Sequence, residues 1–280
     1  MAVVLGCNFA SADTIRGIGM DFVTIGNAGN AGDTRTGTDS GYPLANPYGC
    51  GAVGYNYRIG KYEVTAAQWQ TINTAAGIGN SGTWSGNQPA ASITWYDAAQ
   101  FCNYLTSGNK YSGAYKFDIG GNFLSTDRVS SISTYGTTYV IPTEDEWYKA
   151  AYFKPNGSGY SLYANGTSTA PIAGVNSNYD WAIGAPWNIT NGTQEQNGTF
   201  DMMGNVWEWN ETLFYGSSRG LRGGSYYFRP QYDLRSSIRG IYDPYYEYYD
   251  LGFRVASVPE PATLLILGLG GLFLHCRKQS

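Results

Sequence analysis

Alternating and helical patterns of hydrophobic residues predict a mixture of short strands and short helices. Apolar and polar residues alternate over residues 20–25 and again over 54–64, as in strands whose successive side chains face opposite sides. Further along, three threonines are each followed three residues later by Gln, Asp or Glu, and the first two introduce apolar residues at spacings of three and four. This pattern predicts helices that start after Thr65, Thr94 and Thr143.

Much of the remaining chain is expected to be irregular. Residues 154–199 are rich in Gly, Asn, Ser and Thr with scattered aromatic residues, and no helix or strand pattern continues through them. No internal repeat is visible, and residues 200–256 are dense in short motifs. The predicted fold class is therefore α+β, in one domain with a few short helices, short strands and long loops.

The composition indicates a folded domain that does not bind nucleic acid. Hydrophobic residues make up 42% of the 280 residues, including 25 Tyr and 8 Trp, whereas charged residues make up only 14%. The charged share of typical soluble domains is about 25%. The net charge of −4 and the lack of a basic stripe argue against a nucleic-acid partner. The single histidine is His275, near the end of the chain, which excludes His-based triads and His-ligated zinc in the domain upstream.

The last residues are typical of a targeting signal. Val258-Pro259-Glu260-Pro261 precedes an uncharged apolar stretch, residues 262–276, and the basic pair Arg277-Lys278 follows. We expect a hydrophobic C-terminal helix here, although bilayer-spanning helices usually need about 17–25 residues. The alternative, a helix buried in the domain, is disfavoured by the glycines and by the Pro-Glu-Pro entry. The basic end suits the cytoplasmic side of a membrane.

This order of features resembles the PEP-CTERM sorting signal of Gram-negative bacteria. The resemblance covers residues 258–278, within a predicted sorting and anchor segment at 258–280. It implies export, a transient anchor in the inner membrane and processing by an exosortase. It also implies a final location at the cell surface or in the exopolysaccharide matrix.

The first residues, 1–12, are predicted to be a signal peptide. Residues 2–10 are apolar, and Ala10-Ser11-Ala12 forms a small-x-small cleavage site before Asp13. The basic region that usually precedes the apolar stretch is missing. A weaker alternative is that Leu5-Gly6-Cys7 resembles a lipoprotein box.

Two cysteines remain inside the predicted domain, residues 13–257. Cys50 and Cys102 could form a disulfide in an oxidising compartment. Because two cysteines form no framework pattern, two separate buried thiols are the alternative.

Several short segments occur in a characteristic order along the domain. They are Ile59–Thr65, Ser92–Ala99, Ile141–Trp147, Asp201–Trp209, Leu221–Tyr226 and Leu251–Val255. Together they resemble the sulfatase-modifying factor family, which has the formylglycine-generating enzyme fold, over residues 20–256. The resemblance implies a fold similar to a C-type lectin domain, with little regular secondary structure.

The resemblance does not extend to the catalytic metal. Formylglycine-generating members oxidise a cysteine with copper held by two cysteines that follow the Gly-Gly-Ser segment. In this chain Phe228 and Asp233 stand near those positions. A phenyl ring does not bind copper(I), and a carboxylate is a hard ligand for that soft ion. We therefore do not expect copper as a cofactor.

Calcium is the cofactor that the resemblance implies. Asp201 and Glu208 would provide side-chain oxygens, and Gly204 and Val206 would provide backbone carbonyls. Hard oxygen ligands from a short irregular loop suit calcium. The alternative is a pair of carboxylates that accept hydrogen bonds from backbone amides. A second family site would use an asparagine of the 176–178 segment.

A run of tyrosines with acidic neighbours, Tyr242 to Tyr249, is the most unusual local feature. Aromatic rings with polar tips are common in carbohydrate and peptide sites. With aromatic residues that follow the Gly-Gly-Ser segment, the run predicts a ligand site. The residues assigned to it are Tyr226, Tyr227, Phe228, Tyr232, Tyr245 and Tyr246. The alternative is a loop that only covers the core.

These features predict an exported, surface- or matrix-sorted protein with a binding role, and polysaccharide or a surface protein as its partner. A divergent oxidase or a true formylglycine-generating enzyme is the competing prediction. A purely structural matrix component is the third. The missing copper cysteines favour binding or structure over catalysis.

Overall fold

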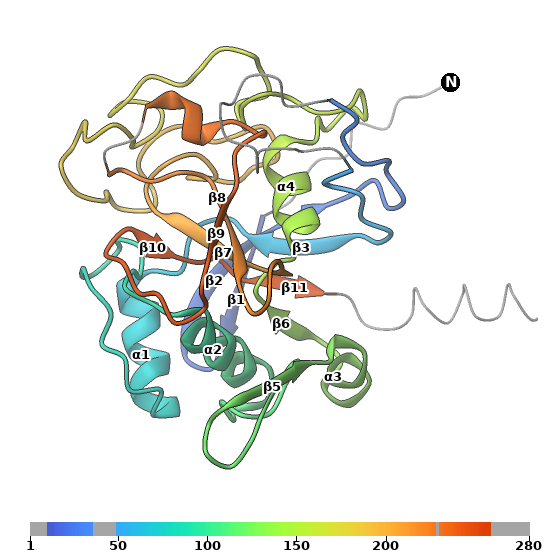
Figure 1. The fold of residues 1–280 in the computed structure, drawn as a ribbon, viewed down its shortest axis with the longest axis vertical. Coiled ribbons are helices and arrows are strands. Elements are labelled where there is room, and N and C mark those ends of the chain that lie inside the picture. The colour runs from blue at the N-terminus through green and yellow to red at the C-terminus, as the bar shows by residue number, and fades with distance from the viewer. Residues whose placement is uncertain (1–9, 36–48, 228–229, 259–280) are drawn as a thin grey trace, which may run out of the picture.

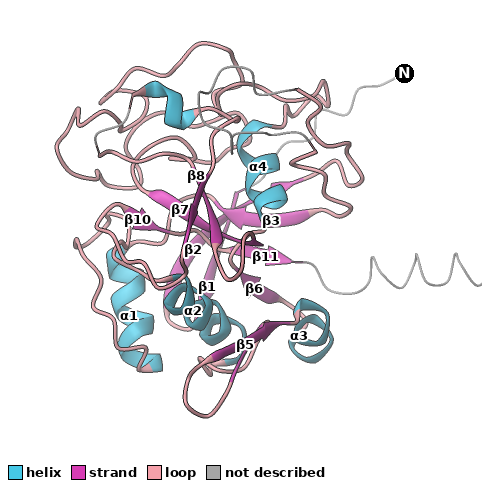
Figure 2. Ribbon diagram, in the orientation of Figure 1, coloured by secondary structure: helices cyan, strands magenta, loops and turns pink. Residues whose placement is uncertain are grey.

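The computed structural model of the chain describes residues 10–35, 49–227 and 230–258. Its helices are α1 (Ala66–Ala76), α2 (Trp95–Ser107), α3 (Arg128–Tyr135) and α4 (Glu144–Tyr152), with a short 3-10 helix η1 (Gln231–Leu234). Figure 1 shows α1 and α2 on one side of the sheets and α4 with the long loops on the other. Loops dominate that second side (Figure 2).

The main sheet brings the two ends of the described chain together. Its strands, in spatial order, are β1 (Ala10–Ile15), β2 (Ile18–Ile25), β3 (Tyr57–Gly60), β11 (Ala256–Val258) and β6 (Thr138–Val140). All neighbours are antiparallel, and Ala256 of β11 pairs with both Ile59 and Val140. The last described strand therefore lies inside the sheet, between β3 and β6.

A smaller sheet carries the motif-dense part of the chain. Its strands, in spatial order, are β10 (Leu251–Gly252), β7 (Trp207–Leu213), β8 (Arg219–Arg222) and β9 (Gly240–Tyr242). Glu208 of β7 pairs directly with Arg222 of β8. A separate hairpin consists of β4 (Tyr115–Phe117) and β5 (Phe123–Thr126). The mixed helices and sheets confirm the predicted α+β class.

The three predicted helix starts are confirmed. Thr65, Thr94 and Thr143 are the N-caps of α1, α2 and α4, and each forms a capping box with the residue three positions on. Such caps satisfy amide groups that the first helical turn cannot pair. The sequence did not predict α3, because only Ser131 of that helix is buried and it therefore shows no apolar stripe.

Aromatic side chains fill the core between α1, α2 and the sheets. Trp69 stacks on Phe101 with ring centroids 5.6 Å apart, and Phe253 meets both rings edge-on. Trp95 and Trp209 are completely buried. These tryptophans anchor the core.

The long irregular segment is also confirmed. No helix or strand occurs between α4 and β7, a stretch that the structure describes throughout. Side chains fix it in place instead: Asn197 Nδ2 donates to Ala150 O at 2.9 Å and to Phe153 O at 2.7 Å. The loop therefore has a defined path without regular backbone pairing.

The predicted end segments fall mostly outside the described residues. The C-terminal hydrophobic helix, residues 262–276, lies outside them, and no described helix is long and apolar enough to cross a membrane. Residues 10–12, the predicted cleavage site, belong to β1. The signal peptide at 1–12 therefore stays a prediction.

Candidate functional site

The turn that begins at Asp201 has a tightly constrained backbone. Asp201, Gly204 and Asn205 all adopt the left-handed conformation. A Cβ on Gly204 would lie 2.2 Å from Asn178 O, so only glycine fits there. Asn205 N donates to the same carbonyl at 2.7 Å. The Gly-Asn pair thus locks the turn against the long loop.

Glu208, at the end of this turn, is committed to a buried ion pair. Arg254 Nε and Nη2 donate to its two oxygens at 2.6 and 2.5 Å, and both side chains have 0% exposure. Trp147 Nε1 donates to the same carboxylate at 2.7 Å. Such a two-point contact is the strongest form of Arg–carboxylate pairing.

Two further carboxyl groups lie buried beside this pair. Val206 N donates to Glu63 Oε1 at 3.1 Å, and Asn205 Nδ2 donates to Oε2 at 2.6 Å. Burial raises the pKa of Glu63 well above its usual range, and the Asp201 and Glu208 carboxylates raise it further. Burial likewise raises the pKa of Asp201 well above its usual range. The turn therefore holds more acid than Arg254 alone neutralises.

The geometry only partly fits the calcium site implied by the family. Asp201 Oδ1 accepts from Trp187 Nε1 at 2.9 Å, while Oδ2 is buried without a hydrogen-bond partner. Glu208, by contrast, already has its charge balanced by Arg254. Within the described residues no three His, Cys, Asp or Glu side chains are grouped so as to hold a metal ion. The orphaned oxygen of Asp201 is compatible with a cation there, whereas the ion pair with Arg254 opposes Glu208 as a ligand.

The two asparagines of the second predicted calcium segment, residues 176–178, lie in different surroundings. Asn178 lies beside the turn, and its buried Oδ1 has no hydrogen-bond partner. Asn176 instead stabilises its own loop: Oδ1 accepts from Ile172 N at 3.1 Å, and Nδ2 donates to Thr193 Oγ1 at 3.0 Å. Only Asn178 is therefore near the other predicted ligands.

The two cysteines of the domain are separate buried thiols, so the disulfide alternative is wrong. Cys50 Sγ lies 3.3 Å from Arg239 Nη2, and Cys102 belongs to α2. Burial raises the pKa of Cys50 to about 11 and that of Cys102 well above its usual range. Both thiols are thus protonated at neutral pH and weakly nucleophilic.

One group of aromatic rings surrounds Tyr226. We call it the Tyr226 group: Trp84, Trp181, Tyr226, Tyr227 and Tyr249. Tyr226 is buried and stacks on Trp181 at 5.6 Å, and Tyr226 N donates to Asn205 O at 2.8 Å. Trp181, Tyr227 and Tyr249 are 45%, 38% and 39% exposed. The group therefore presents a ring surface that is anchored directly to the Asp201 turn.

Strained backbone supports this group. Trp84, Asp180 and Trp181 all have positive φ, at 71°, 54° and 60°. Each such residue costs on the order of 1–3 kcal/mol, and strain of this kind tends to collect at functional sites. The sequence could not reveal Trp84 and Trp181 as members of the group, because nothing in a residue's neighbours predicts positive φ for tryptophan.

The tyrosine loop, residues 242–250, forms a second group of rings. Tyr246 and Tyr248 stack with centroids 5.6 Å apart, and Tyr242 meets both edge-on. Tyr245 packs on Tyr96 at 4.8 Å and is 71% exposed. All of these rings except Tyr96 reach solvent extensively. They extend the aromatic area beyond the Tyr226 group.

The remaining residues of the predicted ligand site are not part of these groups. Tyr232 lies on η1, where the Arg235 guanidinium covers its ring at 4.3 Å. Asp233 lies on the same short helix, and Phe228 is outside the described residues. Tyr226 and Tyr227 belong to the Tyr226 group, whereas Tyr245 and Tyr246 belong to the tyrosine loop.

The two sheets, the fixed long loops and the Gly-Asn turn define a formylglycine-generating-enzyme-like fold. A sulfatase-modifying factor enzyme 1-like domain matches residues 30–258, and a PEP-CTERM protein-sorting motif matches residues 257–279. The chain belongs to the sulfatase-modifying factor family. Its sorting motif marks an exported protein that an exosortase recognises at the membrane.

Curated relatives resemble this chain over part of their length. Chaperone protein LppX of Paenibacillus barcinonensis is 30% identical over 179 residues, covering 55% of this chain and 61% of that protein. Hercynine oxygenase of Mycobacterium tuberculosis is 26% identical over 230 residues, covering 71% and 52%. The chain thus spans between half and two thirds of these relatives. Their names include both a chaperone and an oxygenase.

Solved structures support the fold. Treponema denticola variable protein 1 has a TM-score of 0.65 and 23% identity, covering 89% of this chain and 99% of that one. PvdO from Pseudomonas aeruginosa has a TM-score of 0.64 and 16% identity, covering 89% and 98%. At these identities the likeness concerns the fold alone.

Proposed function

We propose that this chain is an exported binding protein and that its aromatic surface holds polysaccharide. The aromatic surface consists of the Tyr226 group together with the tyrosine loop. The observation that carries the proposal is the exposure of so many anchored rings, from 38% for Tyr227 to 71% for Tyr245. A ring offers a flat apolar face to the C–H face of a sugar and, in tyrosine, a hydroxyl at its tip.

Several rings in two groups suit a polymer better than a single small molecule. Tyr227 and Tyr249 meet at 5.1 Å in one group, and Tyr246 and Tyr248 stack in the other. Tyr248 and Tyr249 are neighbours in sequence, so the tyrosine loop contributes rings to both groups. A chain of linked sugars would contact successive rings and gain affinity from each.

The charge of the surface limits which polysaccharide it would hold. The tyrosine loop contains Asp243, Glu247 and Asp250 and no Lys or Arg. Like charges repel, so an acidic polysaccharide is disfavoured, whereas a neutral or ammonium-bearing polymer is not. Lysine-like ammonium groups would also gain cation–π contact with the rings. The proposed ligand class is therefore a neutral or amino-substituted glycan.

A divergent oxidase is the competing function. The hercynine oxygenase relative favours it, because the similarity extends over 71% of this chain. Against it, Phe228 and Asp233 stand where formylglycine-generating members carry copper cysteines. The remaining thiols, Cys50 and Cys102, are buried and apart from each other in the fold. Binding is consequently the better supported class.

Affinity electrophoresis of the full chain tests the proposal. A neutral glucan, a partly deacetylated chitin and an alginate would be set in the gel. We expect the glucan or the chitin to retard the wild-type chain. Trp181→Ala, and the double variant Tyr246→Ala with Tyr248→Ala, should each weaken this retention roughly tenfold. Loss of an anchoring ring often costs more than about 1 kcal/mol of binding free energy. Tyr135→Ala is the matched control, because Tyr135 is 41% exposed on α3, away from this surface. Retention equal in all variants, or none with any polymer, would contradict the proposal.

A further inference from the structure

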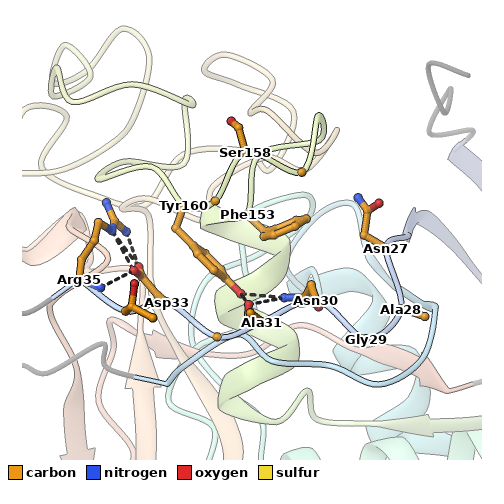
Figure 3. Close-up of a pocket in the computed structure, with 14 residues that line it drawn as sticks. Asn27, Ala28, Gly29, Asn30, Ala31, Asp33, Arg35, Phe153, Ser158 and Tyr160 are labelled. Carbon is orange, nitrogen blue, oxygen red and sulfur yellow. Dashed lines mark hydrogen bonds and ion pairs between the residues drawn. The ribbon is translucent and has the colours of Figure 1, made fainter. Parts of the chain in front are cut away.

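A cavity of about 550 Å³ lies between two loops that have no regular structure. One loop, residues 27–35, follows β2, and the other, residues 153–160, follows α4 (Figure 3). Phe153 and Tyr160 line it and meet edge to face, with ring centroids 5.1 Å apart. The volume falls within the range of about 300–1,000 Å³ that is usual for small-molecule sites.

Hydrogen bonds hold the loop of residues 27–35 rigidly against Tyr160. The Tyr160 hydroxyl lies 2.9 Å from both Ala31 O and Gly51 O, and it accepts from Asn30 Nδ2 at 2.8 Å. Asn30 Oδ1 in turn accepts from Val53 N at 3.3 Å. Because the protein's own hydrogen bonds fix the loop, the cavity is preformed and binding need not order the loop.

The charged groups of the lining cancel each other. Arg35 Nε and Nη2 donate to the Asp33 carboxylate at 3.0 and 2.5 Å, and Tyr148 also donates to it at 2.6 Å. Asp33 is buried, whereas the Arg35 side chain is 40% exposed. Within the described chain, Arg35 Nη1 donates to no partner. The lining thus carries no net charge, and the two N–H groups of Arg35 Nη1 are available to donate hydrogen bonds to a ligand.

Several polar side chains that line the cavity form no hydrogen bond with the described residues. The side-chain amide of Asn27 and the hydroxyls of Thr34 and Ser158 have no partner among the residues that the structure describes. Asn27 and Ser158 lie on opposite loops of the cavity in Figure 3. Asn27 also has a positive φ of 56°, and its carbonyl accepts from Lys149 Nζ at 3.0 Å. The loop is therefore held in a strained conformation at the edge of the cavity.

We propose that this cavity is a second binding site and that it takes a neutral, hydroxyl-rich ligand of about one or two sugar rings. The partly exposed ring of Tyr160 suits the apolar face of a sugar ring, and Phe153, which is buried, supports that ring from behind. Arg35 Nη1 can donate to ring hydroxyls, and Asn27 and Ser158 can donate or accept. The cancelled charge of Asp33 and Arg35 leaves no excess of cation to bind an anion. The proposal concerns different loops from the aromatic surface and does not rest on it.

Saturation-transfer NMR of the full chain tests the site. The probes are maltose and cellobiose, with glucuronate as an anionic comparison. We expect transfer to at least one disaccharide and at least a twofold weaker signal for glucuronate. Asn27→Gly with Ser158→Ala should reduce the disaccharide signal at least twofold, since glycine keeps the backbone conformation while both polar groups are lost. Ser158→Trp, which fills the cavity, should abolish it.

Two control variants separate binding in this cavity from binding elsewhere on the chain. Ser217→Ala removes an exposed hydroxyl in the turn between β7 and β8 and should leave the signal unchanged. Tyr246→Ala with Tyr248→Ala, on the aromatic surface, should also leave it unchanged. Absence of transfer to both disaccharides would overturn the proposal. So would a signal that survives Ser158→Trp or one that disappears with the tyrosine variant.

Discussion

At the residue scale, one arginine offsets part of the acid that is buried at the centre of the domain. Arg254 pairs with Glu208 and also donates to Gly60 O and Phe200 O at 3.0 Å, so it ties β3, β7 and the long loop together. Glu63 and Asp201 are buried beside it. Removal of this cation would leave several buried carboxyl groups without a counter-charge.

Arg254→Met is therefore expected to lower the free energy of unfolding by about 3–5 kcal/mol, as for other buried pairs that lose one partner. Urea denaturation of the purified chain measures it. Arg58→Met is the control, because Arg58 and Asp13 pair at 2.7 Å with 31% and 27% exposure, and such surface pairs contribute about 0–1 kcal/mol. Equal losses in the two variants would contradict the role given to Arg254.

Lys149 is a buried cation without a carboxylate partner among the described residues. Burial lowers its pKa to about 8, from an ordinary value of 10.5. Between those pH values the unfolded chain holds the proton and the folded chain does not, so the contribution of Lys149 to stability rises with pH. The penalty for burying its charge is complete below pH 8.

Lys149→Met should accordingly be more stable than the wild type at pH 7, and this advantage should shrink between pH 8 and pH 10.5. Chemical denaturation of both proteins across this range measures the difference, and because both share all other titrating groups, the comparison isolates Lys149. A difference that does not change with pH would show that Lys149 titrates normally.

At the element scale, the Asp201 turn is the part of the site that a bound cation would stabilise most. The unpaired Asp201 Oδ2 and the excess of buried acid favour a bound cation. Adding calcium to chelator-treated protein is expected to raise Tm by several degrees, and Asp201→Asn to remove the rise. Asparagine tolerates the left-handed backbone that Asp201 adopts.

Asp180→Asn is the matched control for that experiment. Asp180 has the same positive φ, at 54°, but is exposed, so the variant should keep the response to calcium. A Tm that is identical with calcium and with chelator would show that protonation and Arg254 satisfy the turn without an ion.

The elements differ in how far the sequence predicts them. Thr65, Thr94 and Thr143 revealed three helices because a capping box is a local signal. The helix α3 and the strand β5 carry mostly exposed residues, and β4 is only three residues long, so no apolar pattern marks them. Family motifs located the Asp201 turn. The sequence could not predict that Glu208 forms an ion pair, because its partner Arg254 lies far away along the chain.

The sequence likewise predicts only part of the aromatic surface. The tyrosine loop stands out in the sequence as a dense run, and its exposure follows the expectation of a ligand site. Trp84 and Trp181, by contrast, join the surface through Tyr226, and both come from other loops that lie earlier in the chain. The cavity beside Tyr160 could not be predicted either, because two irregular loops create it together.

At the scale of the whole molecule, the chain joins the family fold to a sorting signal. Phe228 and Asp233 stand near the positions of the two copper-binding cysteines of formylglycine-generating members. The sorting motif begins at residue 257, within the strand β11, and the family domain extends to residue 258. The last strand of the domain therefore leads directly into the sorting motif. Export of a folded domain with an exposed aromatic surface is consistent with a binding role outside the cell.

Our central proposal is that this domain keeps the family fold and does not carry out the cysteine oxidation of formylglycine-generating members. The most direct test incubates the copper-treated full chain with a cysteine-containing, sulfatase-type peptide under oxygen, with an active family member as the positive control. Mass spectrometry then reads the peptide. We predict unchanged cysteine with this chain and aldehyde only with the control. Conversion of the cysteine to an aldehyde by this chain would contradict the account.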